Sequence, residues 1–165
     1  MGLDMYLSAR KRFEKINWQV LQNNDELSYN SPEAVYPKFN DLMEITQMNN
    51  VATDVYGASV EVTCAYWRKA NQIHKWFVDN VQGGNDNCGE YYVSQNKLQE
   101  LLDLVNRALA ERNPTLLSPQ GGFFFGSTDI DEWYWNDLKN TKAKLERIFA
   151  LPEMSALSFY YSSSW

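Results

Sequence analysis

Apolar and polar residues alternate at the beginning of the chain. Over residues 2–10 every second position is apolar, which is the pattern of a strand with one buried face. The apolar positions are Leu3, Met5, Leu7 and Ala9. The alternation therefore predicts a half-buried strand close to the N-terminus.

Further strands are predicted later in the chain. Val60 and Val62 alternate with polar residues around 59–63, and three short apolar or aromatic runs follow. These runs are EYYV at 90–93, GFFFG at 122–126 and ALSFYYSSSW at 156–165. The length and composition of GFFFG predict a buried strand, and we expect the first and last strands of the chain to pair.

Three amphipathic helices are predicted where apolar residues recur with a period near 3.6. The first begins at about Ala65 and ends at the glycine pair 83–84. The second follows the N-cap candidate Ser94, and the third follows a capping-type cluster at 128–132. The expected buried stripes are Tyr66, Ala70, Ile73, Phe77 and Val81; Leu98, Leu101, Leu102, Val105 and Leu109; and Ile130, Tyr134, Leu138, Thr141, Leu145 and Ile148.

The segment between the first two strands differs in composition. It is rich in asparagine, it contains Pro32 and Pro37, and only 38–47 has the pattern of a short helix. The order of the elements predicts an α+β fold, with a short mixed or antiparallel sheet covered mainly on one face by about three helices. We expect a single compact domain of 165 residues with a turn-rich insertion at about 14–56.

The net charge of the chain makes some classes of binding partner less suitable than others. The formal net charge is −6, whereas a protein that binds the phosphate backbone needs a basic stripe, so no direct nucleic-acid backbone binding is expected. An acidic protein is suited to a basic protein partner. No apolar run approaches the length of a membrane span, and the N-terminus lacks the apolar region of a signal peptide, so we expect a cytoplasmic protein without membrane contact.

Motifs for cofactors and metals are not found in the sequence. It contains no GxxxxGK[ST] loop, GxSxG elbow or HExxH helix. Cys64 and Cys88 are not in a CxxC arrangement, and His74 is the single histidine. We therefore expect no cofactor and no metal site.

Five segments together resemble a known family. They are MGLDMYL at 1–7, YWRKANQIHKWFVDN at 66–80, CGEYYVS at 88–94, GFFFGSTDIDEWYWNDLKNT at 122–141 and FYYSSSW at 159–165. The chain resembles a family of small uncharacterised proteins of tailed bacteriophages and prophages, from which the segment at about 14–56 departs. The resemblance implies a viral protein made in the cytoplasm of an infected bacterium, and it raises the hypothesis of a counter-defence role.

The first predicted helix carries most of the candidate polar residues. His74 falls at the edge of its buried face, beside Trp67 and one turn from Asn71. A general base would occupy such a position, and so would a histidine that is hydrogen-bonded within the core. Arg68 and Lys69, near the expected helix start, are either solvated or contact an anion.

The third predicted helix raises a question about its tryptophans. Trp133 and Trp135 fall on opposite flanks of its stripe, about 100° from the centre on a helical wheel. A helix normally hides its large apolar residues under the stripe. We therefore expect both rings to be covered by the chain's own loops, by a ligand or by a partner.

Three hypotheses about function follow from these candidates. The first is that the protein binds and sequesters a small nucleotide-like ligand without chemistry, with Tyr66, Trp67, Trp133 and Trp135 as stacking surfaces and Arg68 and Lys69 as phosphate contacts. The second is an acidic inhibitor that blocks a host defence protein by direct contact. The third is a small hydrolase or transferase that uses His74. A homo-oligomer is compatible with each of them.

Overall fold

The structure of the protein is a computed structural model that describes residues 2–48 and 56–165. The chain divides into two compact units. The first contains the residues up to Arg10 together with Glu61–Trp165, and the second contains Lys11–Val60. The insertion predicted at about 14–56 falls within the range of the second unit, and its residues 49–55 lie outside the described part of the chain.

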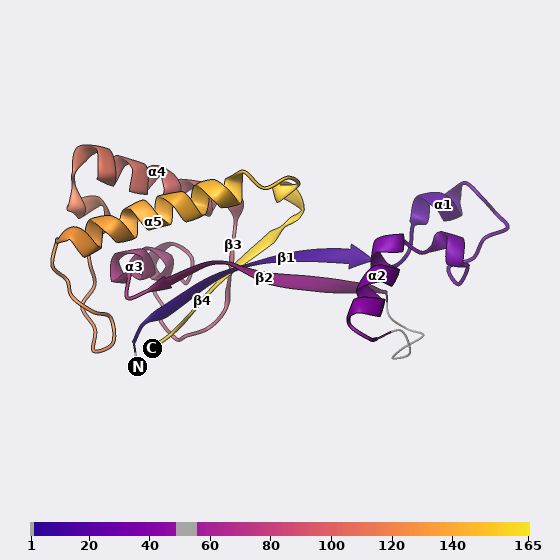
Figure 1. Cartoon of the computed structure of the whole chain (residues 1–165), viewed down its shortest axis with the longest axis horizontal. Coiled ribbons are helices and arrows are strands. Elements are labelled where there is room, and N and C mark those ends of the chain that lie inside the picture. The colour runs from indigo at the N-terminus through magenta and orange to yellow at the C-terminus, as the bar shows by residue number, and fades with distance from the viewer. Residues whose placement is uncertain (1, 49–55) are drawn as a thin grey trace. The chain divides into compact units, whose positions relative to one another are not determined.

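A four-stranded antiparallel sheet organises the first unit, which gives the α+β fold that the sequence predicts. The strands are β1 (Asp4–Glu14), β2 (Gly57–Arg68), β3 (Tyr91–Val93) and β4 (Ser158–Ser164), in the order β2-β1-β4-β3. The first and last strands pair as expected, from Asp4 opposite Ser164 to Arg10 opposite Ser158. This pairing places the two ends of the chain side by side (Figure 1).

The alternation in β1 decides which face of the sheet is buried. Leu3, Met5 and Leu7 are fully buried, as are Phe159 and Tyr161 on β4. Three helices, α3 (Asn71–Asn80), α4 (Gln95–Glu111) and α5 (Glu132–Phe149), lie together on one side of the strands (Figure 1). Their buried residues share one hydrophobic core with the inward face of the sheet. The burial of this apolar surface is the main favourable term for the unit.

The outward face of the sheet is polar and aromatic. Arg10 on β1 donates to Glu61 on β2 at 2.6 Å and to Glu90, just before β3, at 2.5 Å. Its guanidinium group also lies 4.0 Å from the ring centre of Tyr160. Arg10 therefore links three strands on the face that the helices do not cover.

Polar caps fix the ends of the two long helices. The hydroxyl of Ser94 accepts from the backbone N–H of Lys97, which confirms Ser94 as the N-cap of α4. The cap of α5 is Asp131, whose carboxylate accepts from the backbone N–H groups of Trp133 and Tyr134. Short 3₁₀ helices at Pro114–Leu117 (η2) and Met154–Ala156 (η3) follow α4 and α5.

The predicted first helix begins too early, because β2 continues to Arg68. Tyr66, Trp67 and Arg68 therefore lie on a strand, where neighbouring side chains point to opposite faces. The backbone N–H of Lys69 bonds to the carbonyl of Leu3 at 2.8 Å, and Lys69 has a left-handed φ of 58° that ends the extended chain. A helical wheel that starts at Tyr66 therefore gives wrong positions for Trp67 and Arg68 relative to the residues of α3, which begins at Asn71.

The prediction of a buried strand at GFFFG is also wrong. Residues 121–131 form a loop with a turn at 123–125. Phe123 is 95% exposed, Phe124 is half-buried, and only Phe125 is buried. The carbonyl of Phe124 accepts from Leu3 N at 3.0 Å, so this loop closes on the first strand without joining the sheet.

The described part of the second unit contains the end of β1, the start of β2 and several short helices. The helices are α1 (Trp18–Gln22), the 3₁₀ helix η1 (Pro32–Ala34) and α2 (Pro37–Ile45), and α2 overlaps the helix predicted at 38–47. The side chain of Asn17 caps α1, and Ile16 forms a single antiparallel bridge with Val35. Over both described ranges, none of the helices has the length and apolar character required to cross a membrane.

Candidate functional site

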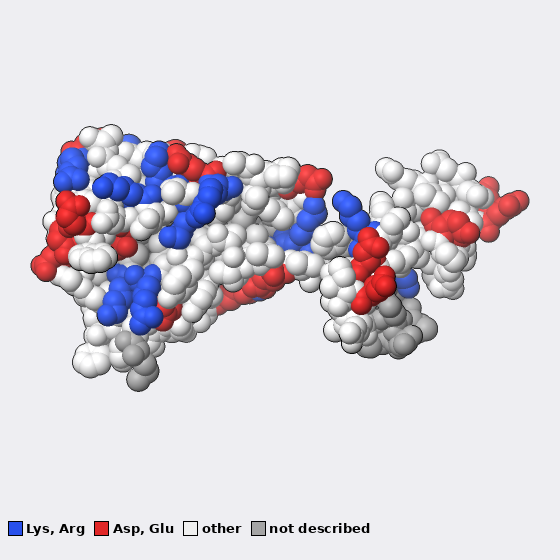
Figure 2. Space-filling view, in the orientation of Figure 1, with Lys and Arg blue, Asp and Glu red and all other residues white. Residues whose placement is uncertain are grey.

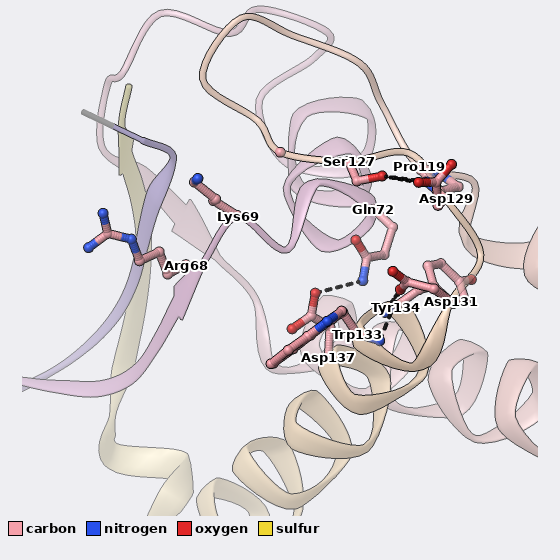
Figure 3. A pocket seen from close by; sticks show the side chains of 11 residues that line it. Arg68, Lys69, Gln72, Pro119, Ser127, Asp129, Asp131, Trp133, Tyr134 and Asp137 are labelled. Atoms are coloured by element: carbon pink, nitrogen blue, oxygen red, sulfur yellow. Dashed lines mark hydrogen bonds between the residues drawn. The ribbon is translucent and has the colours of Figure 1, made fainter.

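A cavity of about 310 Å³ lies in the first unit, where four segments meet. The end of β2 supplies Arg68 and Lys69, the start of α3 supplies Gln72, and the first turns of α5 supply Trp133 and Asp137. The loop before α5 completes the wall (Figure 3). Segments far apart in the sequence therefore build this site together.

Arg68 and Lys69 line one wall of the cavity, with their charged groups directed away from Trp133 and Asp137 (Figure 3). Arg68 is the last residue of β2 and Lys69 forms the turn toward α3, so the two adjacent cations sit at the strand end. Gly126 in the opposite loop approaches Lys69 closely, since a Cβ at Gly126 would lie 3.3 Å from the Lys69 Cβ. Gly126 also has a φ of 90°, which favours glycine, so its side-chain-free backbone shapes this wall.

Another wall carries the carboxylate of Asp137. Asp137 is half-buried, and the side-chain amide of Gln72 donates to its Oδ2 atom at 3.3 Å. Burial raises the pKa of Asp137 above its ordinary value, while the hydrogen bond from Gln72 and the charge of Lys144 act in the opposite direction. The wall therefore presents a carboxylate that is partly desolvated.

The two tryptophans of α5 have opposite environments. Trp135 is 6% exposed, because the ring of Tyr134 packs edge-on at 4.9 Å and the guanidinium group of Arg112 lies 4.3 Å from its ring centre. Trp133 is 79% exposed and lines the cavity. The chain's own residues thus cover Trp135, whereas Trp133 remains available to a ligand.

His74 does not line the cavity and is fully buried in the core. Its Nδ1 atom lies 2.7 Å from the hydroxyl of Tyr161, and its Nε2 atom lies 2.9 Å from Oδ2 of Asp86. Trp165 donates to the other oxygen of Asp86 at 3.1 Å. Because both ring nitrogens already have partners and the ring has no exposed surface, this geometry fits a histidine that holds the core together.

Asn71 stabilises the loop that forms the cavity wall. It is buried, and its amide donates to the carbonyl groups of Phe125 at 3.1 Å and Ser127 at 2.8 Å. Its side-chain oxygen accepts from the backbone N–H of Gln120 at 3.1 Å. Asn71 therefore acts on the site through the loop rather than by facing the cavity.

Tyr66 and Trp67 point away from the cavity. The hydroxyl of Tyr66 bonds to the carboxylate of Asp4, which raises the pKa of Tyr66. Trp67 is buried, and its indole N–H donates to the hydroxyl of Thr141 at 2.9 Å. Of the eight residues predicted to contact a ligand, the structure thus brings Arg68, Lys69 and Trp133 to the cavity and leaves the other five elsewhere.

Sequence reasoning missed Gln72 and Asp137 as cavity residues. Asp137 lies four positions after Trp133, and residues at that spacing are neighbours on a helix surface, so the signal was present. Gln72 gave no such signal, because its position depends on where α3 begins. Across 2–48 and 56–165 no group of three or more His, Cys, Asp or Glu side chains is arranged to hold a metal ion.

Comparison of the chain with protein-family models, with curated proteins and with solved structures finds no match.

Proposed function

We propose that the protein binds a small nucleotide-like ligand in this cavity and holds it without chemical conversion. The observation that carries the proposal is that Trp133, 79% exposed, lines the same cavity as the adjacent cations Arg68 and Lys69. A flat base stacked on an aromatic ring gains about 1–3 kcal/mol. Cationic side chains bind phosphate by charge-assisted hydrogen bonds.

The size of the cavity favours a single nucleotide. Its volume of about 310 Å³ is close to the lower end of the range for small-molecule sites, about 300–1,000 Å³. A polymer is disfavoured by the charge distribution, because acidic and basic side chains alternate over the body that contains α5 (Figure 2). One such pair is Lys142 with Glu146, at 2.8 Å on α5. The resemblance to phage proteins would make the ligand a signal of host defence that this protein sequesters.

Titration of the full chain with nucleoside monophosphates tests the proposal, with calorimetry and tryptophan fluorescence as readouts. We expect saturable binding, which Trp133→Ala weakens by about 1–3 kcal/mol through the loss of stacking. Trp18→Ala is the matched control, because Trp18 is also exposed but lies in the second unit. Charge removal in Arg68→Gln and Lys69→Gln should weaken binding as well. Absence of binding to every nucleotide would overturn the proposal.

A protein partner is the second candidate, and the exposure of Phe123 favours it. Phe123 is 95% exposed at the tip of the loop before α5, and large exposed aromatic residues are typical of interface hot spots. Under this alternative Phe123→Ser abolishes complex formation with a purified basic host defence protein and leaves nucleotide titrations unchanged. Complex formation that is insensitive to Phe123→Ser contradicts the alternative.

A further inference from the structure

Trp133 and Asp137 lie on the same side of α5 and both line the cavity (Figure 3). They are one helical turn apart, and side chains at this spacing have Cβ atoms about 5–6 Å from each other. A flat ring that stacks on the indole of Trp133 would therefore bring one edge close to the carboxylate of Asp137. The pair defines a ring platform with a hydrogen-bond acceptor beside it.

The carboxylate of Asp137 has capacity for a ligand. Gln72 donates to Oδ2, and no ion pair is formed by Asp137 within the described ranges. Each carboxylate oxygen can accept more than one hydrogen bond, so Oδ1 and part of Oδ2 remain available. A partly buried carboxylate without an ionic partner is costly, and a ligand that donates hydrogen bonds would offset that cost.

The other two carboxylates of the cavity already have local partners. One oxygen of Asp131 accepts from two backbone N–H groups as the cap of α5. Asp129 accepts from the hydroxyl of Ser127 at 2.8 Å. Asp137 is also the carboxylate that shares a helix face with Trp133. It is therefore the residue best placed to read the edge of a stacked base.

We propose that the ligand is a guanine nucleotide whose base stacks on Trp133 and whose N1–H and 2-amino groups donate to Asp137. This inference rests on the proposed nucleotide function of the same cavity. Guanine has two adjacent donors on its Watson–Crick edge, which match the two oxygens of a carboxylate. Adenine and cytosine place an acceptor nitrogen beside their amino group, and uracil has a single N–H between two carbonyls. The phosphate would extend toward the end of β2, where the long side chains of Arg68 and Lys69 line the cavity and would turn to meet it.

The test compares GMP, IMP and AMP by calorimetry on the full chain at one ionic strength. IMP keeps N1–H and lacks the 2-amino group, and AMP lacks both donors in this arrangement. Since each hydrogen bond is made to a charged acceptor, we expect GMP to bind roughly tenfold or more tighter than IMP, and IMP to bind tighter than AMP. Asp137→Asn should reduce GMP affinity roughly tenfold or more and remove the preference, with little change for AMP.

Asp129→Asn is the matched control, because it removes one negative charge from the same cavity and leaves Asp137 in place. It should retain the preference for GMP. Equal binding of the three nucleotides, a preference for AMP, or an unchanged preference in Asp137→Asn would overturn the guanine inference and leave the nucleotide function standing. Failure of all three nucleotides, and of the pyrimidine nucleotides, to bind the unmodified chain overturns the proposed function itself. Thermal melting of each variant verifies that it is folded.

Discussion

His74 and Tyr161 join α3 to the central strand β4 through a hydrogen bond of 2.7 Å in the core of the first unit. Neither side chain has exposed surface. The ring of Phe77 stacks on Tyr161 with centres 3.9 Å apart, and burial raises the pKa of Tyr161 well above its ordinary value. Together with Asp86 and Trp165, this pair connects the core to the loop after α3 and to the C-terminal residue.

Tyr161→Phe tests whether this pair stabilises the fold. The substitution keeps the ring and removes the hydroxyl, so Nδ1 of His74 loses its partner in a buried place. A buried polar group without a partner costs about 1–3 kcal/mol, and we expect the free energy of unfolding to fall by about that amount in urea denaturation. Tyr160→Phe is the control, because Tyr160 belongs to the outward face of the sheet. Equal stability of the two variants would contradict a structural role for the pair.

Thr141→Val tests the buried position of Trp67. The hydroxyl of Thr141 accepts from the indole N–H of Trp67 at 2.9 Å and itself donates to the carbonyl of Asp137 at 2.7 Å. Valine fits the same volume without the hydroxyl, which leaves the indole N–H unpaired and should cost about 1–3 kcal/mol. Thr141→Ser, which keeps the hydroxyl, should retain more of the stability in the same denaturation experiment. If valine has no effect, Trp67 is not held as the structure places it.

Asp131→Ala tests where α5 begins. The carboxylate of Asp131 accepts from the backbone N–H groups of Trp133 and Tyr134, at 2.9 and 3.1 Å. Loss of such a cap costs about 0.5–2 kcal/mol. Asp129→Ala is the control, because Asp129 lies outside the helix. A larger loss of stability in Asp129→Ala would mean that the helix starts earlier than Glu132. The sequence of the capping cluster at 128–132 is compatible with such an earlier start.

The sequence predicts the elements whose pattern is local and misses the positions that tertiary contacts decide. The alternation of Leu3, Met5 and Leu7 is sufficient for β1, because one face of the sheet is buried and the other is not. The cap Ser94 is equally local. The end of β2 is different, because it depends on the hydrogen bond from Lys69 N to the carbonyl of Leu3. Leu3 lies 66 positions earlier in the sequence, so no local pattern reveals this contact.

The aromatic residues in and near the candidate site likewise depend on tertiary contacts that the local sequence pattern does not reveal. Phe123, Phe124 and Phe125 have equal hydrophobicity, but the turn at 123–125 exposes the first and buries the last. Trp135 is covered by Arg112, whose left-handed φ of 50° at the end of α4 could not be read from the sequence. Trp133 has the same place beside the stripe of α5 as Trp135, so its exposure of 79% also depends on tertiary contacts and not on the local pattern. The cavity was therefore only partly predictable, through Arg68, Lys69 and Trp133.

Asp137→Asn links the candidate site to stability and provides a prediction that depends on pH. Burial raises the pKa of Asp137 in the folded protein above its value in the unfolded chain. The stability that the protonated carboxyl group contributes is therefore fully present below the pKa of the unfolded chain, and it is lost as the pH rises through the pKa of the folded protein. Without a ligand, Asp137→Asn should therefore raise the melting temperature at neutral pH, and the gain should shrink as the pH falls toward values where Asp137 is protonated.

Melting curves of the ligand-free chain and of Asp137→Asn between acidic and neutral pH measure this difference. Asp103→Asn serves as the control, because it removes one negative charge from an exposed position on α4. A gain in melting temperature that is equal in both variants would reflect net charge alone. A gain in melting temperature confined to Asp137→Asn would show that Asp137 lowers the stability of the ligand-free protein. A loss of ligand affinity in the same variant would show that Asp137 serves binding at the expense of stability, as is common for binding-site residues.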